Sequence, residues 1–150
     1  MNKAYKYRLY PTVEQIIYLI KTFGCCRFVF NTALNWRILA YNADGTSISY
    51  NDTSYGLTAL KRQHPWLNEV DSVALQQSLR HLDVAYKNFF RDKKIGFPKF
   101  KSKRKSRKSY TTININDNVK VLDDGVKLPK VGLIKANMVS KKESAVFYKR

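Results

Sequence analysis

The sequence predicts an α+β protein in which an N-terminal strand joins several C-terminal strands in one sheet or barrel, with four helices inserted after the first strand. Three observations support this prediction. Residues 3–10 alternate between polar and apolar side chains, residues 11–90 repeat apolar side chains at helical spacing, and residues 109–150 return to alternation. A lone strand is not stable in water, so the first strand is expected to pair with the later ones.

The composition is that of a globular protein with an acidic partner. The chain has 150 residues, of which 44% are hydrophobic, and this is enough to bury a core. Its formal charge is +17, and ten Tyr and eight Phe accompany that charge. Cations neutralise phosphates and rings stack on bases, so a nucleic acid is expected rather than a membrane. We see no signal peptide and no apolar run of membrane-spanning length, and we expect a cytosolic protein.

Residues 3–10 are the first expected strand, and a helix should follow. Tyr5, Tyr7 and Leu9 fall on one side of the strand. Pro11 ends it, and Thr12 then has Gln15 three residues later, which is the spacing of a capping box at a helix start. We expect this helix to stop at Gly24, because glycine is common just beyond helix ends.

The second expected helix covers residues 25–42 and carries apolar groups on two sides, as a mostly buried helix does. Its remaining stripe places Arg27, Asn31 and Asn35 at i, i+4 and i+8. These side chains suit either a structural polar network or a nucleic-acid surface. We favour the structural role for Arg27 and Asn31.

The third expected helix covers residues 53–63, and the fourth covers residues 72–90, with Asp71 or Ser72 as its cap. The fourth has an apolar face nearly five turns long. Its opposite stripe consists of Gln76, Arg80, Asp83 and Lys87. Asp83 and Lys87 have the spacing of a solvated ion pair. Gln and Arg are side chains that bind base edges or phosphates, so Gln76 and Arg80 are candidate nucleic-acid contacts.

Residues 91–108, here called the basic segment, separate the helices from the later strands. The basic segment holds ten Lys or Arg and one Asp, a net charge of +9. Such like charges repel one another unless a polyanion such as a phosphate backbone supplies the counter-charge. Phe97 and Phe100 flank Pro98 and are expected to anchor the segment; a solvated linker is the alternative. The candidate phosphate contacts are Lys99, Lys101, Lys103, Arg104, Lys105, Arg107 and Lys108.

The last part of the chain predicts several short strands. Residues 110–115, 119–122 and 126–128 are strand candidates, and the last two flank the turn residues Asp123-Asp124-Gly125. Residues 131–134 and 145–148 are further candidates. The sequence thus predicts four parts: a first strand (1–10), a helical insert (11–90), a basic linker (91–108) and the remaining strands (109–150).

The usual catalytic patterns are missing. The eleven acidic residues are scattered, and the adjacent pair Asp123-Asp124 suits a turn better than a metal site. Cys25 and Cys26 are neighbours and are expected to be buried packing residues, while His64 and His81 are expected to be surface or loop residues. We therefore predict no catalytic residue and no metal or other cofactor in this chain, and regard it as a binder.

Six blocks of the sequence, in order, resemble the N-terminal part of the TnpB family, also called OrfB. Members are encoded by bacterial insertion sequences and are similar in design to type V CRISPR effectors. No single block would be specific, but the match runs over essentially all 150 residues, with the six blocks in the right order. The blocks are YKYRLYPTVEQ at 5–15, GCCRFVFNTAL at 24–34, WLNEVDSVALQQSLRHLDVAYKNFF at 66–90, GFPKFKSK at 96–103, SYTT at 109–112 and VKLPKVGLIK at 126–135.

The resemblance implies part of an RNA-guided DNA endonuclease, with guide RNA and target DNA as partners. The strands would belong to a wedge domain resembling an oligonucleotide-binding β-barrel, possibly incomplete here, and the helices to a recognition lobe. Tyr50 and Gln76 would approach the short DNA motif beside the target. Ser72 departs from similar proteins that carry Lys there, which puts the motif preference in doubt.

The resemblance also implies what this sequence lacks. Family members continue into a RuvC-like nuclease that binds Mg and into a four-cysteine Zn module, so we expect this chain to be truncated and catalytically inert. The alternative is a stand-alone regulator, either a helix-turn-helix repressor or a nuclease-dead guide-directed one. Exposed strand edges in residues 109–150 are expected to favour self-association.

Overall fold

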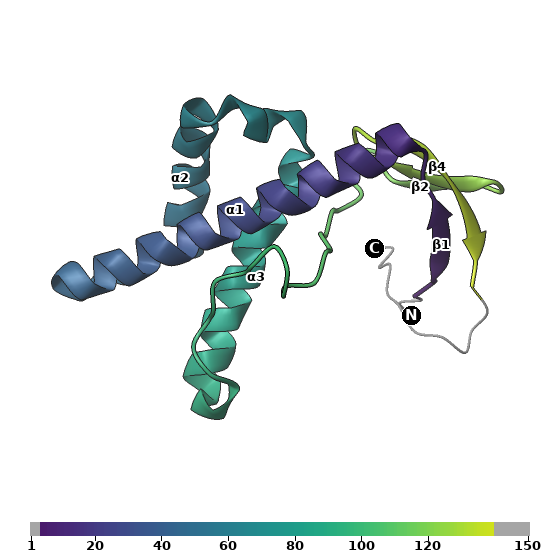
Figure 1. Ribbon diagram of the computed structural model, residues 1–150. Coiled ribbons are helices and arrows are strands. Elements are labelled where there is room, and N and C mark those ends of the chain that lie inside the picture. The colour runs from purple at the N-terminus through teal and green to yellow at the C-terminus, as the bar shows by residue number, and fades with distance from the viewer. Residues whose placement is uncertain (1–3, 140–150) are drawn as a thin grey trace. The chain divides into compact units, whose positions relative to one another are not determined.

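The computed structural model describes residues 4–139, which form two compact units (Figure 1). The sheet unit consists of the described residues up to Leu19 together with those from Ile113 onward, and the helical unit is Ile20–Thr112. All three α-helices lie between the first strand and the other three in the chain. The α+β class is therefore confirmed.

The sheet unit is built on four antiparallel strands in the order β1-β4-β3-β2. The strand from the N-terminus lies beside the last one, with Tyr7 opposite Met138, so the expected pairing of the first strand with the later strands is confirmed. The strand bounds are Tyr7–Tyr10 for β1, Lys120–Val121 for β2, Gly125–Leu128 for β3 and Gly132–Met138 for β4.

One face of this sheet forms a small core. Alternate side chains of β3 and β4 are buried, because successive residues of a strand point to opposite faces. Tyr7 and Leu9 of β1 pack against this cluster, which confirms the expected alternation over residues 7–10. Tyr5, expected on the same side, lies before the strand and is exposed. The buried members of the cluster are Val126, Leu128, Ile134 and Ala136.

The described strands form an open sheet and not the expected oligonucleotide-binding barrel. Strands β1 and β2 are its two edges, and within residues 4–139 they do not pair with each other. The strand expected at residues 145–148 lies outside the described residues.

The strand expected at residues 110–115 is absent, because backbone N–H groups near its end bond to local asparagine side chains and not to a neighbouring strand. The backbone N–H of Ile115 donates to Asn118 Oδ1 at 2.7 Å, and the N–H of Val119 donates to Asn114 Oδ1 at 3.1 Å. Asparagine side chains compete with sheet pairing in this way. The next two residues, Asn116 and Asp117, adopt positive φ angles of 51° and 57° and turn the chain.

The helical unit contains most of one long helix and two shorter ones, which pack through a buried leucine core. The core includes the fully buried side chains of Leu34, Leu75, Leu79 and Leu82. The apolar face expected on residues 72–90 is confirmed over its first four turns. The helix bounds are Val13–Asp44 for α1, Tyr50–Gln63 for α2 and Ser72–Arg91 for α3, with short 3-10 helices at Pro65–Glu69 and Lys93–Ile95.

The prediction of four helices is wrong, since α1 runs through Gly24 without a break for 32 residues. A helical glycine costs only about 1 kcal/mol relative to alanine. Buried residues continue on both sides of it, from Thr22 to Cys25 and Cys26, so tertiary packing outweighs that cost. The two expected helices are therefore one.

Side-chain caps fix where the helices begin. Before α1, the backbone N–H of Thr12 donates to Gln15 Oε1 at 2.9 Å, and that of Gln15 donates to Thr12 Oγ1 at 3.3 Å, which confirms the expected capping box. Ser49 and Asp52 form a second capping box, and for this reason α2 begins three residues earlier than expected. Asp71 caps α3 by accepting from Val73 N at 3.0 Å.

By length and composition alone, α1 could cross a membrane, against the expectation of no apolar run of that length. A core helix of a soluble protein meets the same criterion. Val29, Phe30, Ala33 and Leu34 of α1 are buried in the helical unit.

Candidate nucleic-acid interface

Part of the basic segment is attached to α1 by the side chain of Asn31. The Lys101 N–H donates to Asn31 Oδ1 at 2.8 Å, and Asn31 Nδ2 donates to the Lys101 carbonyl at 2.9 Å. The Lys101 ammonium lies 4.3 Å from the centre of the Phe30 ring. Lys101 is thus half-buried, and this burial lowers the pKa of its ammonium group. This segment is held in place at Lys101.

The two phenylalanines of the basic segment have different surroundings. Phe97 contacts the rings of Tyr86 and Phe89 of α3 edge-on, with 5.4 Å between ring centres in both cases. Pro98 is buried next to it, and the turn before it uses Gly96 at a positive φ of 87°. Phe100 is 54% exposed. Phe97 therefore packs on α3 with part of its ring, although it remains 45% exposed, and the Phe100 ring is accessible to a ligand.

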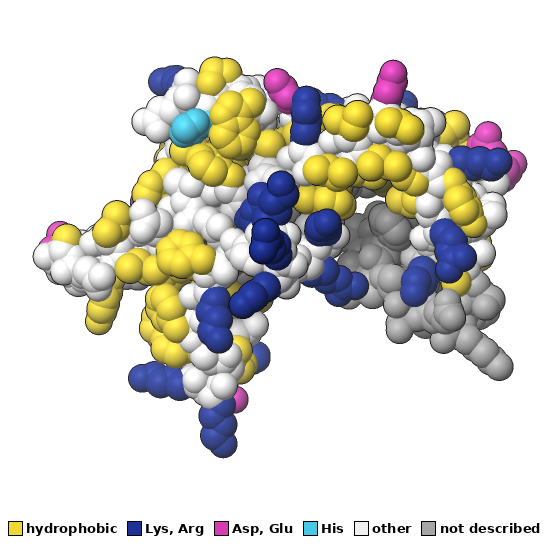
Figure 2. All heavy atoms as spheres, in the orientation of Figure 1, with side chains coloured by type: hydrophobic (Ala, Val, Ile, Leu, Met, Phe, Trp, Pro, Cys, Tyr) yellow, Lys and Arg dark blue, Asp and Glu magenta, His cyan; other side chains and the backbone are white. Residues whose placement is uncertain are grey.

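The other predicted cations of the basic segment are exposed and lack acidic partners. The ion pairs among residues 4–139 are Lys21–Glu69, Arg37–Asp83 and Lys87–Asp83, and none involves this segment. Figure 2 shows Lys and Arg side chains gathered over the middle of the helical unit. The exposed cations of the segment are Lys99, Lys103, Arg104, Lys105, Arg107 and Lys108.

A second polar surface lies between α2 and α3. The Arg80 guanidinium carbon of α3 lies 4.5 Å from the ring centre of Tyr50, the first residue of α2. Gln76, one turn before Arg80, lines a shallow hollow with Asn51 and Tyr55 of α2. The structure thus brings Tyr50 and Arg80 into contact and places Gln76 on the same side of α3. Ser72 is exposed at the first turn of α3.

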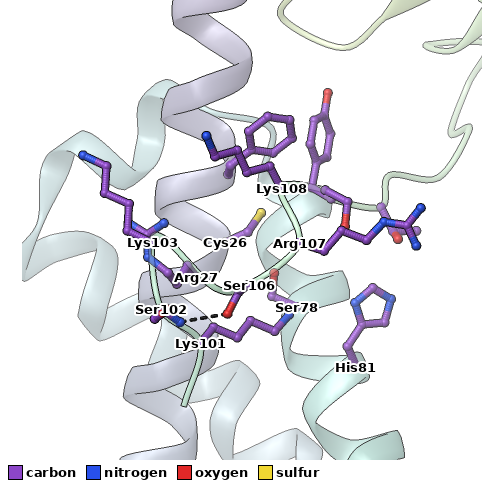
Figure 3. A pocket seen from close by; sticks show the side chains of 14 residues that line it. Cys26, Arg27, Ser78, His81, Lys101, Ser102, Lys103, Ser106, Arg107 and Lys108 are labelled. Carbon is purple, nitrogen blue, oxygen red and sulfur yellow. Dashed lines mark hydrogen bonds between the residues drawn. The ribbon is translucent and has the colours of Figure 1, made fainter. Parts of the chain in front are cut away.

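The polar stripe of α1 is divided between three surroundings. Asn31 holds the basic segment, Arg27 lines a hollow beneath that segment, and Asn35 is exposed. Figure 3 shows the hollow, with Arg27 and Cys26 on α1 and with Ser78 and His81 on α3.

A buried ion pair was missed by the sequence analysis. Arg37 of α1 is only 8% exposed, and its guanidinium Nη2 donates to Asp83 Oδ1 at 3.2 Å. The guanidinium carbon lies 4.7 Å from the centre of the Tyr86 ring. Asp83 also pairs with Lys87 at 2.9 Å, as its spacing predicts. The missed signal is that Arg37 continues the buried stripe of Phe30, Ala33 and Leu34 at helical spacing.

The cysteines are buried thiols, as expected. Burial raises the pKa of the Cys26 thiol to about 11, and its sulfur donates to the Ala74 carbonyl at 3.6 Å. Burial also raises the pKa of Cys25. Both thiols are therefore protonated and poorly reactive near neutral pH. Within residues 4–139, no three His, Cys, Asp or Glu side chains are grouped so that they could hold a metal ion.

The two histidines differ from each other. His64 lies in the loop between α2 and the following 3-10 helix, which agrees with the expectation of a surface or loop residue. It is partly buried there and packs edge-on against Phe28, with 5.1 Å between ring centres. His81 is exposed, as expected. Partial burial and the nearby Lys101 charge lower the pKa of His81, which favours its neutral form at pH 7.

Comparison with known proteins gives a consistent relationship. Residues 1–46 match a family model described as a helix-turn-helix domain of the OrfB proteins of IS605-type elements. Within this stretch, the structure has β1 and the continuous helix α1. Residues 4–46, the described part of the match, thus include no turn between two helices.

Three curated relatives are similar over about two thirds or more of this chain. A "Putative RNA-guided DNA endonuclease" of Streptomyces pristinaespiralis is 46% identical over 73% of this chain and 27% of its own length. A "Putative RNA-guided DNA endonuclease InsQ" of Escherichia coli K12 is 39% identical over 67% of this chain and 25% of its own length. "Virulence protein VsdF" of Salmonella dublin is 39% identical over 69% of this chain and 95% of its own length.

The chain spans about a quarter of the length of the two endonuclease relatives and nearly all of the virulence protein. The family model and two of these relatives agree with the resemblance carried by the six sequence blocks. The chain belongs to the TnpB, or OrfB, family of insertion-sequence proteins.

Proposed function

We propose that the chain is the nucleic-acid-binding part of a transposon-associated, RNA-guided DNA endonuclease, and that it binds guide RNA and target DNA without cleaving them. The observation that carries this proposal is the basic segment. Its exposed cations have no acidic partner within residues 4–139, and its position is fixed by the Asn31 bonds. Fixed, uncompensated positive charge is what a phosphate backbone requires.

The two surfaces of the helical unit would have different tasks. The basic segment would neutralise phosphates without regard to sequence, with the exposed Phe100 ring available to stack on a base. Tyr50, Gln76 and Arg80 would lie near the motif beside the DNA target, because Gln and Arg donate hydrogen bonds to base edges. The contact between Arg80 and Tyr50 would orient the guanidinium.

The sheet unit would form part of a wedge barrel that holds the guide RNA. Support comes from the pairing of β1 with β4, which joins the two ends of the described chain in one sheet. In this proposal, the Mg-dependent nuclease and the Zn module belong to parts of family proteins beyond the matched stretch, and binding takes place in the bacterial cytosol or nucleoid.

The salt dependence of binding tests the proposal. We expect the affinity for a labelled single-stranded oligonucleotide to fall by about two and a half decades between 50 and 200 mM salt, if roughly six phosphates are contacted. Fluorescence anisotropy measures this. A flat salt response would contradict the proposal.

A triple variant separates the basic segment from the charge of the chain as a whole. Replacing Lys103, Arg104 and Lys105 by Ala should weaken binding equally for all sequences and lower the salt slope by about two, roughly 0.7 for each lost contact with a single strand. The matched control replaces Lys120, Lys127 and Lys135, which are exposed on the sheet unit, and removes the same charge. The loss should be larger for the first variant; equal losses in the two variants would mean that the basic segment contributes no more to binding than the cations of the sheet unit.

A different change tests the motif-reading surface. The test uses a complex in which this chain is joined to the nuclease part of a full-length family protein. There, Gln76→Ala should change which DNA motif is preferred, because a lost bidentate contact reduces the discrimination between bases by about 1–3 kcal/mol. Target-library cleavage measures the preference. An unchanged motif would remove Gln76 from this role.

A stand-alone binder is the second candidate function, favoured by the relative VsdF, since the match covers 95% of that protein. Such a protein would bind nucleic acid with no nuclease partner. If so, the affinity for a preferred sequence should be the same with and without added guide RNA. Binding that requires guide RNA would favour the first candidate.

A further inference from the structure

A small hollow lies under the folded part of the basic segment, between α1 and α3 (Figure 3). We name it the basic hollow. Its volume of about 30 Å³ gives room for about two water-sized groups. This is enough for the non-bridging oxygens of one phosphate and too little for a base. Its walls include Arg27, Ser78, Lys101 and Ser106.

The basic hollow carries positive charge without compensation. Five cations line it, and none of the lining residues is acidic. The ion pairs found among residues 4–139 include none of the five. Several cations around one partly enclosed space attract an anion more strongly than cations spread over a surface, because the low-dielectric walls focus the field. The five cations are Arg27, Lys101, Lys103, Arg107 and Lys108.

The outer wall of the basic hollow is a turn held by its own hydrogen bonds. Ser102 N donates to Ser106 Oγ at 2.8 Å, Lys105 N donates to Ser102 Oγ at 2.9 Å, and Ser106 N donates to the Ser102 carbonyl at 3.1 Å. The preceding residue, Lys101, is attached to Asn31. A wall ordered before the ligand arrives reduces the entropy lost on binding.

The cations continue on both sides of the basic hollow. In Figure 3, the side chains of Lys103 and Arg107 extend to opposite sides of it. A terminal phosphate would need positive charge on one side only, whereas an internal phosphate has a chain that leaves in two directions. The arrangement therefore suits a phosphate inside a strand.

We propose that the basic hollow binds one internal phosphate of a nucleic-acid backbone, with Arg27 and Lys101 as its charged walls. This inference rests on the proposed function and deepens it. It makes Arg27 a backbone contact and gives the basic segment a fixed point from which the strand continues along Lys103 and Arg107.

The test compares charge-removing variants by anisotropy at about 50 mM salt, with a labelled single strand of about 20 nucleotides that is long enough to span the site. Arg27→Gln should weaken binding by at least about tenfold, as expected for a lost hydrogen bond to a charged group. The matched control Arg62→Gln removes one exposed charge from α2, and its effect should stay within about twofold. Lys108→Gln, at the exposed rim, should weaken binding even if Arg27→Gln fails to fold by circular dichroism.

A second arm identifies the source of the phosphate. Strands that begin with a 5′-phosphate or a 5′-hydroxyl should bind wild type equally well if the bound phosphate is internal. A preference for the 5′-phosphate that disappears in Arg27→Gln would overturn the internal assignment. Equal effects of the Arg27, Lys108 and Arg62 changes would overturn the site while leaving the proposed function intact. Failure of wild type to bind at low salt would instead refute the proposed function.

Discussion

Arg37 and Asp83 show how a charged pair is accommodated inside the helical unit. Burial alone would raise the pKa of Asp83, but hydrogen bonds and charges from Lys87 and Arg37 outweigh it and lower that pKa. The Tyr86 ring covers the other side of the guanidinium. Removing one partner of such a pair is costly, because it leaves the other buried charge uncompensated.

This pair gives a prediction for stability against pH. A carboxylate with a lowered pKa stabilises the fold above its unfolded value of about 3.9 and loses this contribution as the pH falls through the folded value. Asp83→Asn should therefore reduce the free energy of unfolding by about 3 kcal/mol at pH 7, and this difference should shrink below about pH 4. Urea unfolding across this pH range measures it.

The control for this prediction is Asp123→Asn, which changes an exposed turn carboxylate. Its effect should stay within about 0.5 kcal/mol at every pH. A difference between wild type and Asp83→Asn that does not depend on pH would mean that side-chain packing, and not charge, stabilises this position.

At the residue scale, the sequence predicted types of side chain better than their surroundings. The separation of Asp83 and Lys87 in the sequence is enough to predict their contact, because both lie on one helix. Arg37 and Asp83 are 46 positions apart, and their pairing depends on how α1 packs against α3. Likewise, Lys101 resembles its basic neighbours in the sequence, and only the bond to Asn31 distinguishes it.

Among the helices, two glycines that look alike in the sequence have opposite surroundings. A methyl group added at Gly24 in α1 would meet no atom nearer than Arg27 Nη2, at 4.0 Å. A methyl group added at Gly56 in α2 would lie 2.6 Å from a carbon of the Trp36 ring on α1. Gly56 therefore allows α2 to approach α1, while Gly24 has no such packing role.

We predict opposite signs for the two alanine variants. Gly24→Ala should raise the free energy of unfolding by about 0.5–1 kcal/mol, because alanine is the better helix former. Gly56→Ala should lower it by about 1–3 kcal/mol, because the methyl group forces the Trp36 ring to move. Each variant is the control for the other in urea unfolding. A stabilised Gly56→Ala would show that the ring shifts at no cost.

The elements themselves were predictable where a local signal fixed them. Thr12 with Gln15 and the cap Asp71 each mark a helix start, and the acidic pair before Gly125 marks a turn. The helix end predicted at Gly24 is wrong, because a glycine does not end a helix when buried residues continue beyond it on the same face. The strand predicted at residues 110–115 is wrong, because alternation of β-branched residues does not predict that the Asn114 and Asn118 side chains accept hydrogen bonds from the nearby backbone.

In the whole molecule, the sheet unit depends on chain segments that are far apart, whereas the helical unit is one continuous stretch. Strand β1 pairs with β4 more than a hundred residues later. Residues Ile20–Thr112 contain their own leucine core. This difference follows from the insertion of the helices after the first strand, which alternation at both ends of the sequence was enough to predict. The same alternation could not predict whether the sheet closes into a barrel, because closure depends on the register between strands.

We predict that residues 20–112 fold when produced alone. They should give a helical circular dichroism spectrum and unfold cooperatively, since their buried core lies within the stretch. The matched control is the full chain with residues 1–10 removed. It should lose protection from amide exchange in β3 and β4, because Tyr7 and Leu9 no longer cover the sheet core. An unfolded 20–112 fragment would show that the helical unit needs the sheet.

We also propose that the chain self-associates through its strand edges, and the structure limits which edge is suitable. Strand β2 is only two residues long, and short charged edge strands resist pairing with other chains. The edge formed by β1 is therefore the candidate. Sedimentation of the full chain would give a monomeric mass if neither edge associates.

The two bonds between Asn31 and the Lys101 peptide group limit which amino acids position 31 can accept. The side-chain amide faces that peptide group as a neighbouring strand would, giving one hydrogen bond and receiving one. An aspartate at position 31 could only accept a hydrogen bond, so the Lys101 carbonyl would lose its donor. A glutamine there is longer by one methylene group and would push the basic segment away from α1. The identity of the side chain at position 31 is therefore more specific to this arrangement than the excess of positive charge around Lys101.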